Sequence, residues 1–219
     1  MQKEYIIRFL IVILCVIGII LYIKNRVSII RWKRVNKNIK KKRVNRNTKI
    51  INKDKEFGEI EYYSDSSYFE STIDIEILGK TIKTKLLIGR TDDEMEVSAS
   101  QREVYNIFYK NKKKIEDEIL QKILSYYNDI ERFSYGPDDE EENKLWWPEI
   151  KSKKDLVNHL ELDSILIPAT FLLDENRIIY LLFNRDWGGE DDEDNGVAVK
   201  IVNEHVIDVG YKDIAYMNN

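Results

Sequence analysis

The longest apolar run of the chain covers Phe9 to Ile23, fifteen residues without a charged or strongly polar side chain. As a helix, the nineteen residues from Tyr5 to Ile23 rise about 28 Å, close to the roughly 30 Å of a bilayer's hydrocarbon core. Arg8 lies near the end of this helix, where a long basic side chain can reach the headgroups. The pattern predicts a transmembrane anchor at residues 1–23, with residues 5–23 inside the membrane.

A cleaved signal peptide is the alternative, because Lys3 and Arg8 could form its basic end. However, no small-x-small cleavage site follows Ile23, and Leu14 stands where a lipid-modified Cys15 would need a small residue. These features favour an uncleaved anchor. Cys15 is also the only cysteine, so a disulfide within the chain is excluded.

Residues 24–55 are strongly basic, with fourteen Lys or Arg and one acid, Asp54. This bias places the carboxyl side of the anchor in the cytoplasm. We interpret 24–55 as a juxtamembrane stalk and linker whose residues 24–49 contact anionic lipid. Nucleic acid is not an expected partner, because Trp32 is the only aromatic residue of this segment available for base stacking.

The remaining residues, 56–219, begin and end with short alternating patterns typical of strands. In the clearest one, Ile73, Ile75 and Ile77 alternate with acids, and the turn Gly79-Lys80 follows. A second hairpin is predicted across Asn203-Glu204. The predicted strands are 58–63, 72–78, 82–88, 164–167, 170–173, 178–183, 197–201 and 206–209.

Helical patterns fill the middle of this region. Apolar residues at helical spacing predict two helices, at about 99–111 and 113–130, with Ser100 and Glu103 as a capping box. A surface loop at 133–143 and a short helix at about 153–161 are expected next. The order strands, helices, strands predicts an α+β domain with a mainly antiparallel sheet, helices packed on one face, and Ile75 and Ile123 in the core.

Charge is divided unevenly along the chain. Residues 56–219 contain 19 basic and 37 acidic side chains, a net charge of −18. Much of this charge is concentrated in the segments 138–142 and 186–194, each next to tryptophan. Such a domain attracts basic proteins or metal ions.

No phosphate-binding loop, dinucleotide fingerprint or His-Glu-x-x-His motif occurs, and His159 and His205 fit structural roles. We therefore expect a protein that is not an enzyme and needs no cofactor. The alternatives are a metal-dependent enzyme or a Ca²⁺-responsive module that uses the acidic loop 186–196. An EF-hand is rejected, because Val202 stands where a bidentate glutamate is required.

We predict that a basic protein partner binds the acidic segments, with arginine stacking on tryptophan. The predicted partner-binding residues are Trp146, Trp147, Asp186, Trp187, Glu190, Asp191, Asp192, Glu193 and Asp194.

The carboxyl half resembles a group of uncharacterised bacterial domains of unknown function. Their pattern is an apolar strand, Trp-Asp-x-Glu, a glycine before a Val/Ile strand, and Val-Gly with a later Asp. The matching residues are Phe171, Trp187, Glu190, Gly196-Val197-Ala198-Val199, Val209-Gly210 and Asp213, and Leu78-Gly79-Lys80, Gln101, Tyr105 and Tyr126-Tyr127 resemble the amino half. Gly188 departs from the pattern, since it stands where the Asp after Trp is expected. The resemblance implies a domain that is not an established enzyme, with some members among toxin–immunity genes.

Overall fold

The computed structural model describes residues 49–63, 66–91, 94–136, 140–173, 176–188 and 196–216. Residues 48–219 form one compact unit. No helix among the described residues has the length and apolar character that crossing a membrane requires, and the predicted anchor at residues 5–23 lies outside them.

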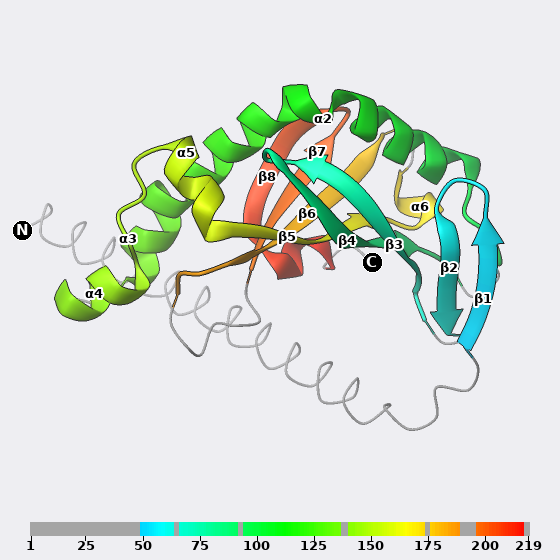
Figure 1. The fold of residues 1–219 in the computed structure, drawn as a ribbon, viewed down its shortest axis with the longest axis horizontal. Coiled ribbons are helices and arrows are strands. Elements are labelled where there is room, and N and C mark those ends of the chain that lie inside the picture. Colours follow the sequence, from blue (N-terminus) through cyan, green and yellow to red (C-terminus); the bar gives the residue numbers. More distant parts are fainter. Residues whose placement is uncertain are drawn as a thin grey trace, which may run out of the picture. The chain divides into compact units, whose positions relative to one another are not determined.

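The domain is α+β, as predicted, with an eight-stranded sheet whose spatial order follows the chain (Figure 1). The described neighbours pair antiparallel, except β4 and β5, which pair parallel. The strands are β1 (Lys49–Asp54), β2 (Gly58–Tyr63), β3 (Tyr68–Ile77), β4 (Lys80–Gly89), β5 (Leu160–Ile167), β6 (Ile178–Arg185), β7 (Val197–Val202) and β8 (His205–Tyr211). Strand β1 was not predicted and lies in the range assigned to the linker.

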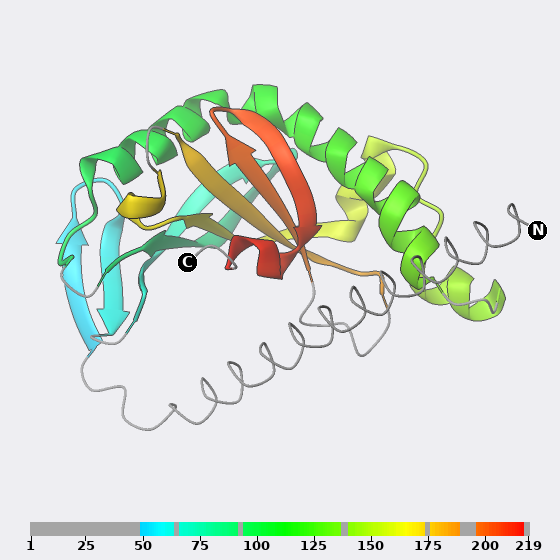
Figure 2. The same ribbon diagram turned by 180° about the vertical axis from the view of Figure 1, so that it is seen from behind.

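The helical elements lie mostly between β4 and β5. They are α2 (Ala99–Tyr126), the π-helix η1 (Tyr127–Glu131), α3 (Arg132–Tyr135), α4 (Glu140–Trp146), α5 (Lys153–Leu156), the 3₁₀ turn η2 (Val157–His159), α6 (Thr170–Leu173) and the 3₁₀ turn η4 (Lys212–Ala215). Helix α2 crosses one face of the sheet, and η4 lies on the other side (Figure 2).

The core fills the space between α2 and the sheet. The exposed fractions of Ile75 and Ile123 are 1% and 0%, which confirms their predicted core positions. A smaller apolar cluster lies on the opposite face, where Tyr180, Leu182 and Ala198 pack with Ala215 of η4. Both faces are thus apolar in the central strands, which explains the continuous apolar run of β6.

The prediction of two helices at 99–111 and 113–130 was wrong, since α2 is continuous for 28 residues. The polar residues around Lys112 do not interrupt the helix, and the Lys112 side chain lies buried with its ammonium group 4.4 Å from the Tyr109 ring centre. The capping box also differs from the prediction. Ser98 accepts from the Gln101 N–H, and the Gln101 side chain accepts from the Ser98 N–H.

Three other element predictions need correction. Residues 170–173 form a helical turn rather than a strand, because short apolar runs do not distinguish the two. Within the predicted loop 133–143, residues 133–135 belong to α3 and residues 140–143 belong to α4. The predicted helix 153–161 gives way to a 3₁₀ turn and then to β5 at Leu160, although Ser152 caps it through the Asp155 N–H.

Candidate functional site

A π-helical turn follows directly after α2. The Arg132 N–H bonds to the Tyr127 carbonyl, five residues earlier, which widens the turn. Tyr127 and Glu131 both point into the domain, each with an exposed fraction of 0%. Because π-turns inside helices often occur at functional sites, this segment is a natural place to look for one.

Glu131 forms a buried ion pair with Arg185, the last residue of β6. Arg185 Nη2 lies 3.0 Å from Glu131 Oε1, and the exposed side-chain fractions are 2% and 0%. The indole N–H of Trp187 donates to Glu131 Oε2 at 3.0 Å, and Arg185 Nη1 donates to the Trp187 carbonyl. The pair anchors the chain where it leaves β6 towards the acidic loop.

Aromatic rings surround this ion pair. Tyr127 stacks on Trp147 with ring centres 6.4 Å apart, and its ring centre is 4.7 Å from that of Trp187. The Tyr127 hydroxyl donates to the Pro148 carbonyl at 2.6 Å. Burial raises the pKa of Tyr127 well above its ordinary value, so this hydroxyl stays protonated and serves as a hydrogen-bond donor.

The end of α4 meets the chain that leaves β6 at this cluster. Helix α4 begins in the first segment and ends at Trp146, and the Gly188 N–H donates to the Trp146 carbonyl at 2.9 Å. Arg132 Nε donates to the carbonyl of the next residue, Trp147, at 3.2 Å. The start of the second acidic segment is therefore fixed beside the end of α4.

The predicted partner-binding residues fall into three groups. Trp147 and Trp187 are 5% and 3% exposed, so their rings pack in the core rather than at the surface. Trp146 is half-buried and Asp186 is exposed. The remaining five, Glu190, Asp191, Asp192, Glu193 and Asp194, lie outside the described residues.

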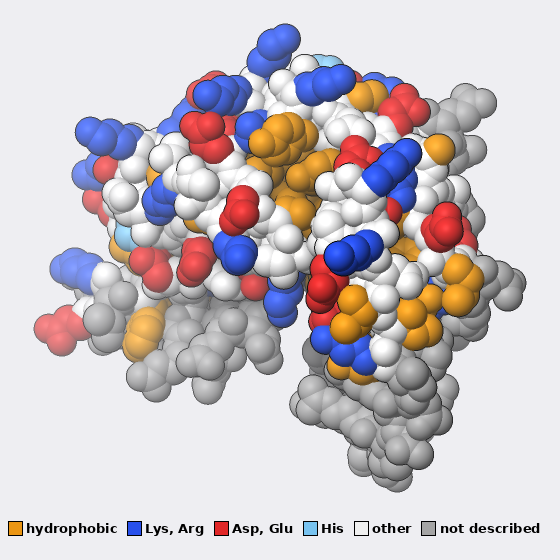
Figure 3. Space-filling view, turned by 45° about the vertical axis from the view of Figure 1, so that its right-hand side comes forward, with side chains coloured by type: hydrophobic (Ala, Val, Ile, Leu, Met, Phe, Trp, Pro, Cys, Tyr) orange, Lys and Arg blue, Asp and Glu red, His pale blue; other side chains and the backbone are white. Residues whose placement is uncertain are grey.

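The outer side of the same helical segment carries exposed apolar side chains. Ile130 is 52% exposed and Phe133 is 87% exposed. Asp129 and Glu141 are exposed as well. On the face towards the β1–β2 end, basic and acidic side chains are interspersed around a group of apolar ones (Figure 3). The π-turn end thus combines apolar and acidic surface.

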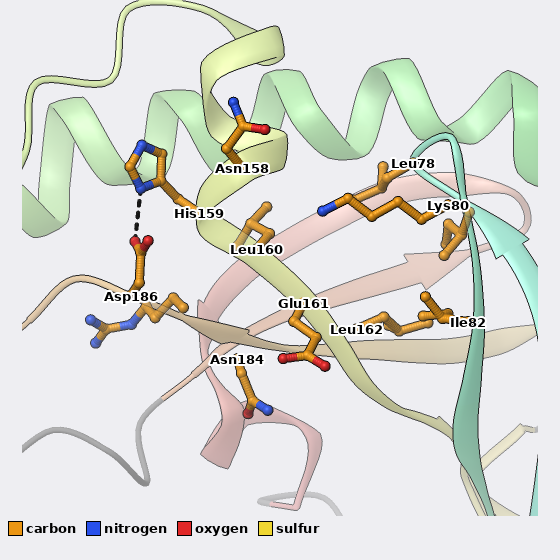
Figure 4. A pocket seen from close by; sticks show the side chains of 12 residues that line it. Leu78, Lys80, Ile82, Asn158, His159, Leu160, Glu161, Leu162, Asn184 and Asp186 are labelled. Atoms are coloured by element: carbon orange, nitrogen blue, oxygen red, sulfur yellow. Dashed lines mark hydrogen bonds and ion pairs between the residues drawn. The ribbon is translucent and has the colours of Figure 1, made fainter.

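A cleft of about 420 Å³ opens between the first halves of β4 and β5 (Figure 4). Its apolar wall includes Ile77, Ile82 and Leu162. His159 Nδ1 lies 2.8 Å from Asp186 Oδ1 at one side of the cleft. Asp186 thus belongs both to the cleft and to the start of the acidic loop.

Metal binding gains no support from the described part of the chain, where no group of three or more His, Cys, Asp or Glu side chains could hold an ion. His205, the second histidine considered above, is exposed with Nδ1 3.9 Å from Glu118 Oε2. Residues 189–195, which include five of the acids on which the metal alternatives depended, are not among the described residues.

Sequence reasoning missed Glu131 and Arg185. One signal was present, since the apolar series Ile115, Ile119, Ile123, Tyr127 continues at the same spacing to Glu131. A glutamate in line with buried residues indicates a buried charge with a partner. No comparable signal identified Arg185.

Fold and site together define an α+β domain built on one sheet, with a buried Glu–Arg–Trp cluster at one end. The chain belongs to a family described as a domain of unknown function, DUF6985, whose model matches residues 56–217. This match confirms the resemblance to an uncharacterised domain. Comparisons with curated proteins and with solved structures give no match.

Proposed function

We propose that this protein is a membrane-tethered, non-enzymatic binding domain whose acidic surface recognises a basic protein. The observation that carries the proposal is the hydrogen bond from the Gly188 N–H to the Trp146 carbonyl, which joins the start of the second acidic segment to the end of α4, the helix that begins in the first acidic segment. Two acidic segments attached to neighbouring parts of the domain would attract a cationic partner more strongly than either segment alone.

Exposed apolar residues beside the acids support the same function. Phe133 and Ile130 provide apolar contact area, and the exposed acid Asp129 precedes Ile130 directly. Glu141 of α4 and Asp186 after β6 are further exposed acids. Protein interfaces commonly combine an apolar centre with a polar rim. The buried Glu131–Arg185 pair makes the scaffold under this surface rigid, which lowers the entropy cost of binding.

The anchor and its basic stalk complete the proposal. A tether at residues 5–23 would hold the acidic surface near the cytoplasmic side of the membrane. Neutralisation of a basic toxin by an immunity-type protein fits this arrangement, in line with the toxin–immunity context that the sequence resemblance implies.

The test replaces Asp191, Asp192, Glu193 and Asp194 by Asn or Gln in the full chain. The partner is a protein isolated with the unmodified chain, and its association rate is measured across salt concentrations. At low salt we expect the rate to fall about tenfold and its salt dependence to weaken, because steering is lost.

The matched control removes four exposed acids elsewhere, through Glu59→Gln, Asp74→Asn, Glu76→Gln and Glu103→Gln. It changes the net charge equally and should leave most of the steering intact. Equal effects of both variants, or none from the loop variant, would contradict recognition by this surface.

A further inference from the structure

Strands β4 and β5 pair along only part of their length. Their parallel ladder joins Lys85–Ile88 to Ser164–Ile167. Before this ladder, residues 80–84 of β4 pair only with β3, and residues 160–162 of β5 pair only with β6. Asp163 lies at an irregularity in the β5–β6 pairing. Thr84 Oγ1 donates to the Asp163 carbonyl at 2.8 Å where the two strands part.

The unpaired edge of β4 presents hydrogen-bonding groups to the cleft. The β3–β4 turn has positive φ at Leu78 and Gly79, 51° and 72°, so Ile77 and Lys80 form the hydrogen-bonded pair that closes a two-residue hairpin. Hydrogen-bonded pairs alternate along an antiparallel ladder. The N–H and C=O groups of Thr81 and Lys83 therefore point away from β3, towards the cleft.

Leu78 itself is unusual at this turn. Glycine, asparagine or aspartate normally occupies the first position of such a hairpin, because a β-carbon is strained at positive φ. Here the position is occupied by Leu78, whose side chain lines the cleft (Figure 4). Strained residues of this kind often occur at ligand-binding sites.

The chemistry of the cleft defines what fits it. Ile77, Ile82, Leu160 and Leu162 supply apolar wall, and the carboxylates of Glu161 and Asp186 lie exposed at the rim. The Lys80 ammonium group donates to the Val157 carbonyl at 3.2 Å. Arg185 also lines the cleft, but its guanidinium group is paired with Glu131. An extended peptide with alternating apolar and basic side chains therefore complements both the backbone edge and the exposed carboxylates.

We propose that the cleft between β4 and β5 binds an extended segment of the basic partner, which pairs with the β4 backbone as an added strand. The basic character of this segment rests on the proposed function. Apolar side chains of the segment contact Ile82 and Leu162, and its basic side chains lie near Glu161 and Asp186.

The probe is the labelled peptide acetyl-Lys-Val-Lys-Val-Lys-Val-amide, titrated against the full chain in detergent and followed by fluorescence anisotropy. Two further peptides carry N-methyl groups on the lysines or on the valines, which removes alternate N–H donors. We expect at least one methylated peptide to bind at least about tenfold more weakly, and both if the segment also pairs with β5. Equal affinity of all three peptides would overturn strand pairing, as would no saturation at about 1 mM peptide.

Thr81→Pro tests the same contact from the side of the protein. It removes an N–H that faces the cleft and leaves the β3 hydrogen bonds intact, so binding should weaken at least about tenfold. The N-methyl comparison on the unmodified chain gives a result even if this variant misfolds.

The loop variant of Asp191–Asp194 separates the two proposals. If N-methylation weakens peptide binding but the loop variant associates with the partner as fast as the unmodified chain, the cleft proposal stands and recognition by the acidic loop is overturned. If the loop variant associates more slowly but N-methylation leaves peptide binding unchanged, recognition by the acidic loop stands and the cleft proposal is overturned.

Discussion

Glu131 and Arg185 are opposite charges held almost completely away from water. A buried pair of this kind gains little over a well-packed apolar pair, because desolvation offsets most of the attraction. Removal of one partner is different, since it leaves the other charge buried without compensation. The tryptophan bond to Glu131 adds a further group that depends on the carboxylate.

We therefore predict that Arg185→Met lowers the free energy of unfolding by about 3–5 kcal/mol, whereas the double variant Glu131→Leu, Arg185→Met loses clearly less. Urea denaturation followed by tryptophan fluorescence measures both, because Trp147 and Trp187 are buried beside the pair. A double variant at least as unstable as the single one would mean that the two charges are not coupled.

For individual residues, the sequence predicted which apolar side chains are buried. Alternation assigned Ile75 to the core, and helical spacing assigned Ile123, because periodic burial leaves a periodic pattern. The buried positions of Trp147 and Trp187 depend instead on which elements meet at the π-turn. Local periodicity does not contain that information.

The β1–β2 hairpin is the most loosely joined element of the sheet. Two residue pairs, Ile60–Ser71 and Glu61–Glu70, connect β2 to β3. Arg102 of α2 holds the hairpin through both oxygens of Asp54, with Nη1–Oδ1 at 2.7 Å and Nη2–Oδ2 at 2.5 Å. The bond to Arg102 is the main reason that the pKa of Asp54 lies well below its ordinary value.

Asp54→Asn should reduce stability in a pH-dependent way. The lowered pKa means that the unfolded chain binds this proton first, so the ion pair stabilises the fold above the ordinary pKa of 3.8 and its contribution disappears as pH falls below that value. Above about pH 5 the variant should be less stable by about 1–2 kcal/mol. Urea midpoints at pH 6 and at about pH 2.5 check this, and a difference that does not shrink in acid would exclude the pair as its cause.

Elements marked by turn chemistry were predicted well, as in the β3–β4 and β7–β8 hairpins. Elements that are not bounded by characteristic turn residues were predicted poorly. Strand β1 is short, polar and at an edge, so it has no apolar alternation to indicate it. Helix α6 forms where Pro168 ends β5, and four apolar or small residues fit either state.

For the whole molecule, the strongest prediction from sequence alone is the membrane orientation. The fourteen Lys or Arg residues between Lys24 and Lys55 predict that residues 56–219 lie in the cytoplasm. Protease added to intact cells should leave the domain undigested, and the same protease should cleave it after the membrane is made permeable. Digestion of the domain in intact cells would contradict the predicted orientation.

The parallel pairing of β4 with β5 also affects how the domain folds. Neighbouring strands otherwise follow each other closely in the chain, whereas Thr84 and Asp163 meet across 79 residues. Such distant closure slows folding. During synthesis at about 5–20 residues per second, roughly 4–14 seconds pass between completion of β4 and the start of β5. The side of β4 that later pairs with β5 has no partner strand during this time. In that interval the newly made hairpins present an open strand to other chains, which makes this stage the one most exposed to aggregation.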